Sequence, residues 1–347
     1  MIKRENSSPA GHESHAWVNE IKEDDHVRDL YVAKVKRLGL TKRGDPFLSI
    51  TLADRTGDIE ARVWDNADAL SSLFSEGDIL RVEGHASSYR NQVQLTLSNL
   101  KPSGDGVDPS LFLESTAKDI SEMMGSLRDI VNEIRDSHLK KLINRFLSDH
   151  SFVALFKEAP AAKNFHHNYI GGLLEHTLSV CRMILFVAEH YPELDRDLLI
   201  AGAFLHDIGK VREFESNTRI DYTDEGRLLG HLVQGIEMLD EKLSGIKKFP
   251  RETAMKLKHL MLSHHGQYDF GSPKRPKFLE AFALHLIDDL DAKMNGLGRF
   301  MEKDRQEGSW SEFNRMFERY FLKGRIPEIE EVEDPGPPVD DRQKALF

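Results

Sequence analysis

The chain of 347 residues lacks several features that would narrow its class quickly. It has a single cysteine, Cys181, which excludes an intramolecular disulfide. No apolar run approaches the roughly 20 residues that cross a bilayer, and the first residues have no apolar stretch like that of a secretory signal. We find no internal repeat. These absences lead us to expect a cytoplasmic protein that does not enter a membrane.

Charge is plentiful but unevenly distributed. The formal net charge of −11 at pH 7 would by itself disfavour a nucleic acid as a partner. Residues 324–347, however, are rich in Glu, Asp and Pro and have the composition of a disordered acidic tail. Basic residues gather elsewhere, at 34–43 and at 274–277. The net charge therefore does not exclude a nucleic acid.

The first part of the chain has the pattern of a small β-barrel. Five segments alternate apolar and polar side chains, which indicates strands with one buried face: 30–36, 47–52, 59–64, 79–83 and 92–97. Turn residues separate these segments, and a helix is expected at 67–74. Five short strands with a helix between the third and fourth are typical of the OB-fold. We place this barrel at residues 26–103, after an N-terminal extension at 1–25.

From about residue 110 the pattern becomes helical. Apolar residues recur at three- and four-residue spacing over 119–131 and 138–147. Proline and glycine residues around 101–109 indicate a linker. We assign residues 104–160 to this linker and a helical segment, and residues 161–323 to a second, all-α domain. The predicted fold class is therefore α+β with two domains.

Side chains that metals prefer stand in or at the ends of several predicted helices. They are His176, His206, Asp207, His231, His264, His265 and Asp288. Asp207 ends an apolar run, where a buried carboxylate without a partner would cost several kcal/mol. Helical bundles build core sites from side chains that converge in this way. Imidazole with carboxylate suits a catalytic divalent transition metal better than calcium. Asp291 shares the helical face of Asp288 and is expected to act beside the ligands or on the substrate side.

Candidate nucleic-acid contacts occur in both domains. OB-folds bind single strands through stacking aromatics and a basic groove. The candidates are Tyr31, Lys36, Arg37, Arg43, Trp64 and Tyr89 in the barrel, and Lys274, Arg275 and Lys277 after the histidine pair. For Phe47, stacking and burial in the core are equally supported. Lys210 follows Asp207 by about one helical turn, so it could contact a phosphate oxygen as a catalytic group or stand solvated at a helix end.

These motifs resemble known families. The strand segment Ile59-Glu-Ala-Arg-Val-Trp64, with the Asp-Arg-Thr-Gly turn before it, is similar to OB domains of the tRNA-anticodon-binding type. The order His176, His206-Asp207, Asp288 resembles the HD-domain superfamily of metal-dependent phosphohydrolases. The segments Gly171-Gly-Leu-Leu-Glu-His-Thr, Leu205-His-Asp-Ile-Gly-Lys, Ser263-His-His-Gly and Ile287-Asp-Asp-Leu-Asp-Ala-Lys narrow the resemblance to bacterial 3′-to-5′ exoribonucleases of the YhaM type. Those proteins join an OB domain to an HD domain in this order.

The resemblance implies a metal-dependent exonuclease that shortens single-stranded RNA from its 3′ end. His176, His206, Asp207 and Asp288 would be ligands, and histidines 231, 264 and 265 would add a second ion. One or two divalent ions are expected, Mn²⁺ ahead of Mg²⁺, Co²⁺, Fe²⁺ or Ni²⁺. DNA as a further substrate and self-association into a homo-oligomer stay open.

Two other functions also stay open. One is hydrolysis of a small nucleotide, for which an OB domain has no obvious use. The other is nucleic-acid binding with an inactive HD domain. The complete ligand set counts against this second alternative, because degenerate sites usually lose ligands.

Overall fold

The computed structural model describes residues 15–41, 43–89, 92–103, 107–108, 111–216, 218–304 and 306–324. The predicted acidic tail, apart from Gly324, lies outside these residues, as do residues 1–14 of the predicted extension and part of the predicted linker. The chain divides into two compact units, residues 1–294 and 295–347. Among the described helices, none is both long and apolar enough for a bilayer crossing.

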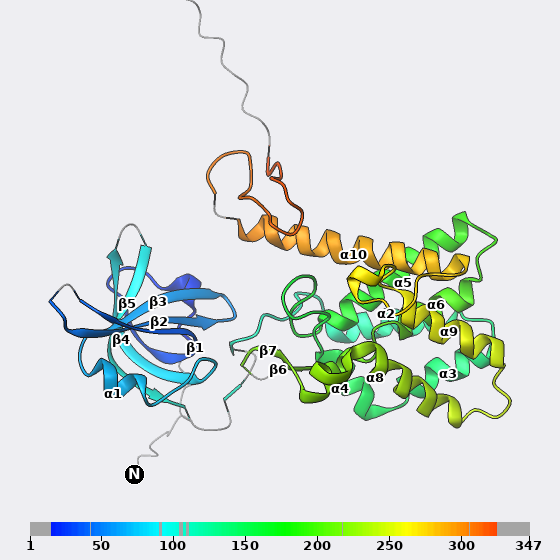
Figure 1. Ribbon diagram of the computed structural model, residues 1–347, viewed down its shortest axis with the longest axis horizontal. Coiled ribbons are helices and arrows are strands. Elements are labelled where there is room, and N and C mark those ends of the chain that lie inside the picture. Colours follow the sequence, from blue (N-terminus) through cyan, green and yellow to red (C-terminus); the bar gives the residue numbers. More distant parts are fainter. Residues whose placement is uncertain are drawn as a thin grey trace, which may run out of the picture. The chain divides into compact units, whose positions relative to one another are not determined.

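Five strands close into a barrel in the N-terminal part of the chain (Figure 1). They are β1 (His26–Leu40), β2 (Pro46–Asp54), β3 (Gly57–Val63), β4 (Ile79–Tyr89) and β5 (Gln92–Pro102). Their order around the barrel is β1-β2-β3-β5-β4, and β1 pairs with β4 to close it. The pair β3–β5 is parallel and the others are antiparallel. Helix α1 (Ala67–Ser71) connects β3 to β4, so the predicted OB-fold is confirmed.

The barrel core extends further toward the N-terminus than the sequence pattern indicated. Residues before β1, including the short 3-10 helix η1 (Val18–Glu20), lie against the barrel, and Ala16, Val18 and Ile21 pack on its core. Tyr31 is fully buried there, and its hydroxyl donates to the carbonyl oxygen of Ala16. The prediction that Tyr31 contacts nucleic acid is therefore wrong, because the preceding segment covers the face on which this ring lies.

Helices make up most of the second domain. Their bounds are α2 (Ile120–Asn132), α3 (Ser137–Leu147), α4 (His150–Glu158), α5 (Gly172–His190), α6 (Arg196–Leu205), α7 (Lys210–Glu213), α8 (Asp224–Ser244), α9 (Arg251–Ser263), η3 (Tyr268–Phe270) and α10 (Leu279–Lys303). Aspartate side chains cap the first turns of α2, α3, α4 and α6 by accepting from backbone N–H groups, as N-caps do.

A small hairpin interrupts this helical pattern. Strands β6 (Phe214–Ser216) and β7 (Ile220–Tyr222) pair antiparallel between α7 and α8. The predicted helical domain therefore also contains one two-stranded sheet. Strands of three residues are too short to give a periodic pattern of their own. The four-residue helix α7 before them is too short for the same reason.

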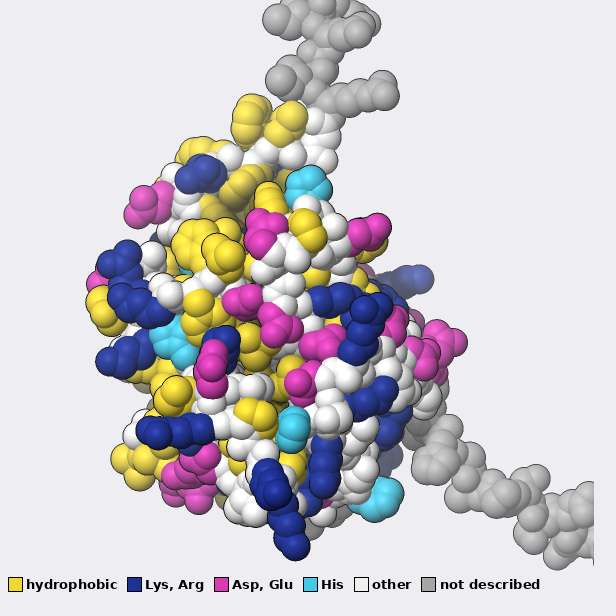
Figure 2. Space-filling view, turned by 90° about the vertical axis from the view of Figure 1, so that its right-hand side faces the viewer, with side chains coloured by type: hydrophobic (Ala, Val, Ile, Leu, Met, Phe, Trp, Pro, Cys, Tyr) yellow, Lys and Arg dark blue, Asp and Glu magenta, His cyan; other side chains and the backbone are white. Residues whose placement is uncertain are grey.

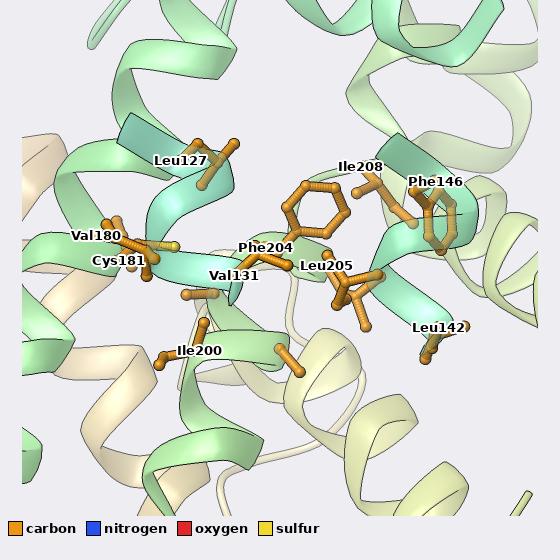
Figure 3. Close-up of a cluster of buried hydrophobic side chains, with 14 of the residues drawn as sticks. Leu127, Val131, Leu142, Phe146, Val180, Cys181, Ile200, Phe204, Leu205 and Ile208 are labelled. Carbon is orange, nitrogen blue, oxygen red and sulfur yellow. The ribbon is translucent and has the colours of Figure 1, made fainter. Parts of the chain in front are cut away.

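The helical core fixes the position of the His206-Asp207 pair. Phe204, Leu205 and Ile208 are buried on both sides of the pair and belong to one hydrophobic cluster with residues from α2, α3 and α5. Figure 3 shows these side chains together with Leu127, Phe146 and Val180. Because packed interiors allow little movement, this cluster holds the backbone of the pair in place.

Charge on one face of the molecule is mixed in sign. On the face drawn in Figure 2, Lys and Arg side chains (dark blue) are interspersed with Asp and Glu (magenta) and with hydrophobic groups (yellow). The net charge of −11 is therefore not concentrated on that face as a continuous acidic surface.

Candidate metal centre

The predicted metal ligands come from five helices or helix ends. His176 lies in α5, His206 is the C-cap of α6 with Asp207 after it, His231 lies in α8, His264 is the C-cap of α9 with His265 after it, and Asp288 lies in α10. Helix α8 is kinked at Gly230, whose φ of 71° and ψ of 164° are not helical. The kink comes immediately before His231 and sets the direction of that side chain.

Four ligand atoms form one compact group: Nε2 of His176, Nε2 of His206, Oδ2 of Asp207 and Oδ1 of Asp288. The two nitrogens are 3.2 Å apart. His176 Nε2 lies 3.1 Å from Asp288 Oδ1 and 3.6 Å from Asp207 Oδ2. His206 Nε2 lies 3.3 Å from Asp207 Oδ2 and 3.6 Å from Asp288 Oδ1. Neighbouring ligands around an ion with bonds of about 2.1 Å are separated by about 3 Å, so these spacings suit one ion.

A second group lies on the other side of Asp207. His231, His264 and His265 each offer a ligand atom within 4.8 Å of the others. Asp207 Oδ1 is 3.6 Å from His231 Nε2 and 3.5 Å from His264 Nε2. The two oxygens of the Asp207 carboxylate thus face two different sets of histidines.

Four of these histidines have a protein partner at Nδ1, and the atom left for an ion is Nε2. The partners are the carbonyl oxygen of Ala203 for His206 at 2.7 Å, that of Met261 for His264 at 2.8 Å, Asp291 Oδ2 for His176 at 2.7 Å, and Glu213 Oε1 for His231 at 3.1 Å. Such contacts orient a ligand imidazole and fix which nitrogen carries the proton. Asp291 therefore lies beside the ligands and touches one of them.

Unpaired buried atoms provide a test of whether these residues fit a metal. Among the described residues, Asp207 Oδ1, His231 Nε2 and His265 Nδ1 are buried and have no hydrogen-bond partner. Leaving a buried polar atom unpaired costs about 1–3 kcal/mol. Three such atoms on one cluster of metal-preferring side chains fit divalent ions, which would satisfy them.

Lys210 provides part of the charge balance at Asp207. Its ammonium is buried and lies 2.6 Å from Asp207 Oδ2. Burial raises the pKa of Asp207, but the positive charges of Lys210 and His206 outweigh it and hold this pKa well below its usual range. The predicted contact of Lys210 with a phosphate oxygen stays a prediction.

The histidines divide into two electrostatic kinds. Burial lowers the pKa of His265 to about 4, and repulsion from His231 adds to it. Burial opposes protonation of His206, but the charge of Asp207 raises its pKa to about 10. Because a ligand imidazole has to be neutral, binding of an ion at His206 would release a proton, whereas His265 is already neutral.

Sequence reasoning missed three residues around the ligands. His167 Nε2 lies 3.0 Å from Asp291 Oδ2, and Glu213 accepts from both the backbone and the ring of His231. His166 has its ring 5.3 Å from that of His176. The adjacent histidines 166 and 167 lie shortly before His176 in the sequence, and this pattern could have identified them as candidate site residues. Glu213 lies in a four-residue helix, and no sequence pattern marked it as a candidate.

The candidate nucleic-acid residues of the barrel differ in what they contact. The exposed Trp64 ring lies 5.4 Å from Phe47, and the Arg62 guanidinium is 5.3 Å from the Phe47 ring, so Phe47 belongs to a surface aromatic pair. The ammonium of Lys36 donates to the carbonyl oxygens of Ser71 and Phe74 at 3.0 and 2.6 Å and is thus used within the barrel.

Other candidates are simply exposed. They are Arg37, Arg43, Tyr89, Lys274, Arg275 and Lys277. A hollow beside Trp64 is lined by Asp45, Asp65 and Asp68, whose negative charge would repel a phosphate backbone. The aromatic pair is therefore suited to stacking on bases rather than to holding phosphates.

Comparison with known proteins agrees with both domains. Residues 15–102 match an OB-fold nucleic acid binding domain, and residues 173–293 match the HD domain. The 3′-5′ exoribonuclease YhaM of Bacillus subtilis (strain 168) is 36% identical over 281 residues, which is 80% of this chain and 88% of that protein. The YhaM protein of Halalkalibacterium halodurans is 34% identical over 317 residues, 90% of this chain and 95% of that protein.

Among solved structures, an OB-fold domain of replication protein A from Methanococcus maripaludis is 17% identical and covers 27% of this chain and 99% of that chain, with a TM-score of 0.22.

The fold and the site define an HD-domain protein with an OB-fold nucleic-acid-binding domain ahead of it, whose His and Asp groups could bind metal. The two YhaM relatives match this chain over most of their own length. The chain belongs to the family of the 3′-5′ exoribonuclease YhaM.

Proposed function

We propose that the protein is a metal-dependent 3′-5′ exoribonuclease that hydrolyses the phosphodiester bonds of single-stranded RNA. The observation that carries this proposal is Asp207, whose two oxygens face two separate sets of histidines. A carboxylate in that position suits a pair of ions a short distance apart. The polarity of cleavage and the preference for RNA come from the names of the relatives.

In this proposal, the residues of the chain bind the ions in two sets. His176, His206 and Asp288 would hold one ion, and His231, His264 and His265 would hold the other. Asp207 lies between the two sets. Two divalent ions in this place would neutralise phosphate charge and lower the pKa of a bound water. We expect Mn²⁺, with Mg²⁺, Co²⁺, Fe²⁺ and Ni²⁺ as the alternatives, because a site rich in imidazole favours transition metals.

Residues around the ligands would keep this arrangement rigid. Asp291 contacts both His176 and His167, and Ser179 donates to its other oxygen. Glu213 holds His231 in the same manner. Fixed ligand directions matter because small displacements in an active site are costly in rate.

The barrel would bind the strand ahead of the cleaved end. Phe47 and Trp64 form a stacking surface, and base–aromatic stacking contributes about 1–3 kcal/mol per base with little sequence preference. An enzyme that removes nucleotides one after another benefits from such a tolerant contact.

The direct test is a time course with 5′-labelled single-stranded RNA, and with DNA of the same sequence, in each of the five metal ions or in chelator. With RNA, we expect labelled products that become progressively shorter over time. In chelator, we expect no products. Early release of a labelled mononucleotide would contradict the polarity. Binding without cleavage in every metal would favour a nucleic-acid-binding protein with an inactive site. Turnover of small nucleotides alone would favour the nucleotide phosphohydrolase.

A further inference from the structure

We infer that the β6–β7 hairpin carries a binding site for the phosphodiester backbone of the RNA strand, separate from the metal centre and next to it. The inference rests on the proposed function, since it names where the substrate is held. The site consists of Lys163, Arg219 and Arg227 around Asp221, and we call these residues the hairpin cluster.

Three cations of the hairpin cluster share one carboxylate. Asp221 Oδ1 accepts from Lys163 at 2.7 Å and from Arg227 at 2.9 Å, and Oδ2 lies 3.1 Å from Arg219. The hydrogen bond from Lys163 holds the pKa of Asp221 at about 2, so this carboxylate is ionised at neutral pH. The cluster therefore has more positive charge than its one carboxylate neutralises.

The positive side of the cluster faces the solvent. The side chains of Arg219 and Arg227 are 62% and 57% exposed, whereas that of Asp221 is 13% exposed. Each guanidinium has five N–H donors in a fixed fork that matches phosphate oxygens. The contacts with Asp221 use only part of these donors, which leaves the others for an arriving phosphate.

The Lys163 side of the cluster adjoins one half of the metal centre. Lys163 is three residues before His166, whose ring lies 5.3 Å from that of His176. A phosphate bound at Lys163 is thus held by the same loop that borders the first group of ligands.

The Asp221 side adjoins the other half. The N–H of Thr223, two residues after Asp221, donates to the carbonyl oxygen of Glu213 at 3.0 Å, and the Glu213 side chain holds His231. Arg227 precedes His231 by four residues in α8. The hairpin cluster therefore connects elements that flank both groups of ligands.

Apolar side chains beside the cluster complete a surface suited to a single strand. Leu228 and Leu229 follow Arg227 and are 83% and 47% exposed. Leucines so exposed, two and three residues before His231, offer contact to a base while the arginines contact the backbone. Unpaired bases in single-stranded RNA present the apolar faces that such contacts require.

A purely structural role for the cluster makes the opposite prediction for Asp221. If the three cations serve only to clamp the hairpin, Asp221→Asn weakens the clamp and impairs RNA binding along with stability. If they bind phosphates, Asp221→Asn removes a competing negative charge and lowers the KM for RNA. The two roles thus predict changes of opposite sign in the KM of Asp221→Asn for RNA.

The experiment measures kcat and KM for a labelled 20-nucleotide RNA at several salt concentrations, and hydrolysis of bis(p-nitrophenyl) phosphate, both with Mn²⁺. The variants are the double variant Arg219→Ala/Arg227→Ala, Asp221→Asn, and the control Arg182→Ala, an exposed arginine of α5. For the double variant we expect a KM for RNA raised at least about tenfold, since hydrogen bonds between charged groups are stronger than those between neutral groups. Its salt slope should fall by about 1.4, or about 0.7 for each lost phosphate contact.

Hydrolysis of the small diester, which is too short to reach the cluster, should stay within about twofold of wild type. A KM for RNA in the double variant equal to that of Arg182→Ala would overturn the inference. So would a raised KM in Asp221→Asn together with lost thermal stability. If the wild-type protein hydrolyses neither substrate, it is the proposed function that fails, so the two failures can be told apart.

Discussion

The barrel and the helical domain both bury a histidine beside aspartates, but they do so differently. In the barrel, His15 Nδ1 lies 3.1 Å from Asp29 Oδ1 and His15 Nε2 lies 3.3 Å from Asp54 Oδ2. Both ring nitrogens therefore face a carboxylate. In the metal centre, the Nδ1 atoms of His206 and His264 are bonded to backbone carbonyls, while their Nε2 atoms point at other ligands.

This difference separates a structural ion pair from a ligand site. Burial opposes the charge on His15, but its interactions with Asp29 and Asp54 raise its pKa to about 9, so it is a cation at neutral pH held between two carboxylates. The metal centre instead contains buried acceptors that face each other without donors between them, such as Asp207 Oδ1 and His231 Nε2. Such convergence suits a cation between the atoms.

The largest effect is expected from Asp207→Asn. Loss of the carboxylate between the two histidine sets should lower kcat for RNA by at least about a thousandfold, because in the proposed function this carboxylate would help to hold both ions. It should also abolish the rise in melting temperature that we expect Mn²⁺ to give the wild-type protein. That rise corresponds to about 2.7 kcal/mol at a hundredfold excess over Kd. Gel assays and thermal unfolding with and without Mn²⁺ measure the two effects.

Controls are needed because Asp207→Asn also leaves Lys210 without its carboxylate partner. His265→Ala is a suitable second variant, since the buried Nδ1 of His265 has no hydrogen bond within the described chain that the substitution could break. Asp289→Asn, beside Asp288 but paired with Lys293 on the surface, serves as the matched control. Retention of activity by both Asp207→Asn and His265→Ala would show that the site lies elsewhere.

A smaller effect is expected in the barrel from pH. The folded pKa of His15, about 9, lies above its ordinary value of 6.5. Its contribution is therefore fully present below pH 6.5 and is lost as pH rises through 9. The loss should approach about 3 kcal/mol in the free energy of unfolding. Urea unfolding at pH 6 and pH 10 measures it through tryptophan fluorescence, to which Trp17 contributes with its ring 4.4 Å from that of His15.

His15→Gln is the reference for this measurement, because other groups titrate over the same range. The difference in stability between wild type and His15→Gln should be large at pH 6 and close to zero at pH 10. A difference that does not change with pH would show that His15 is neutral in the folded protein, and the contrast with the metal centre would then fail.

How far the sequence predicts the molecule depends on the range of the interactions involved. The strands and long helices follow from local alternation and from three- and four-residue spacing, so β2, α2 and α3 lie within two residues of where the pattern placed them. The candidate ligands stand out in the sequence because His206 and Asp207 are polar residues at the end of an apolar run. Both signals are contained in a short stretch of chain.

Features that depend on distant packing could not be predicted. Asp221 is unremarkable in sequence, and its role emerges only when Lys163, 58 residues earlier, reaches it. The prediction that Tyr31 contacts nucleic acid is wrong because alternation identifies a strand but not the segment that covers one of its faces. Here the segment that contains Ala16 covers the Tyr31 ring. Phe47 was undecided for the same reason, until its contact with Trp64 placed it on the surface.

The smallest effects are expected from the two aromatic residues that the sequence could not distinguish. Trp64→Ala removes an exposed ring of the stacking pair and should weaken binding of single-stranded RNA in chelator by about 1–2 kcal/mol, with stability almost unchanged. Tyr31→Phe removes only a buried hydroxyl and should lower stability by about 1 kcal/mol while leaving RNA affinity as it was. Fluorescence anisotropy with labelled RNA and urea unfolding of both variants separate the two effects. If Tyr31→Phe lost RNA affinity and Trp64→Ala kept it, the binding face of the barrel would be the one that the segment before β1 covers, and that segment would have to move aside for RNA.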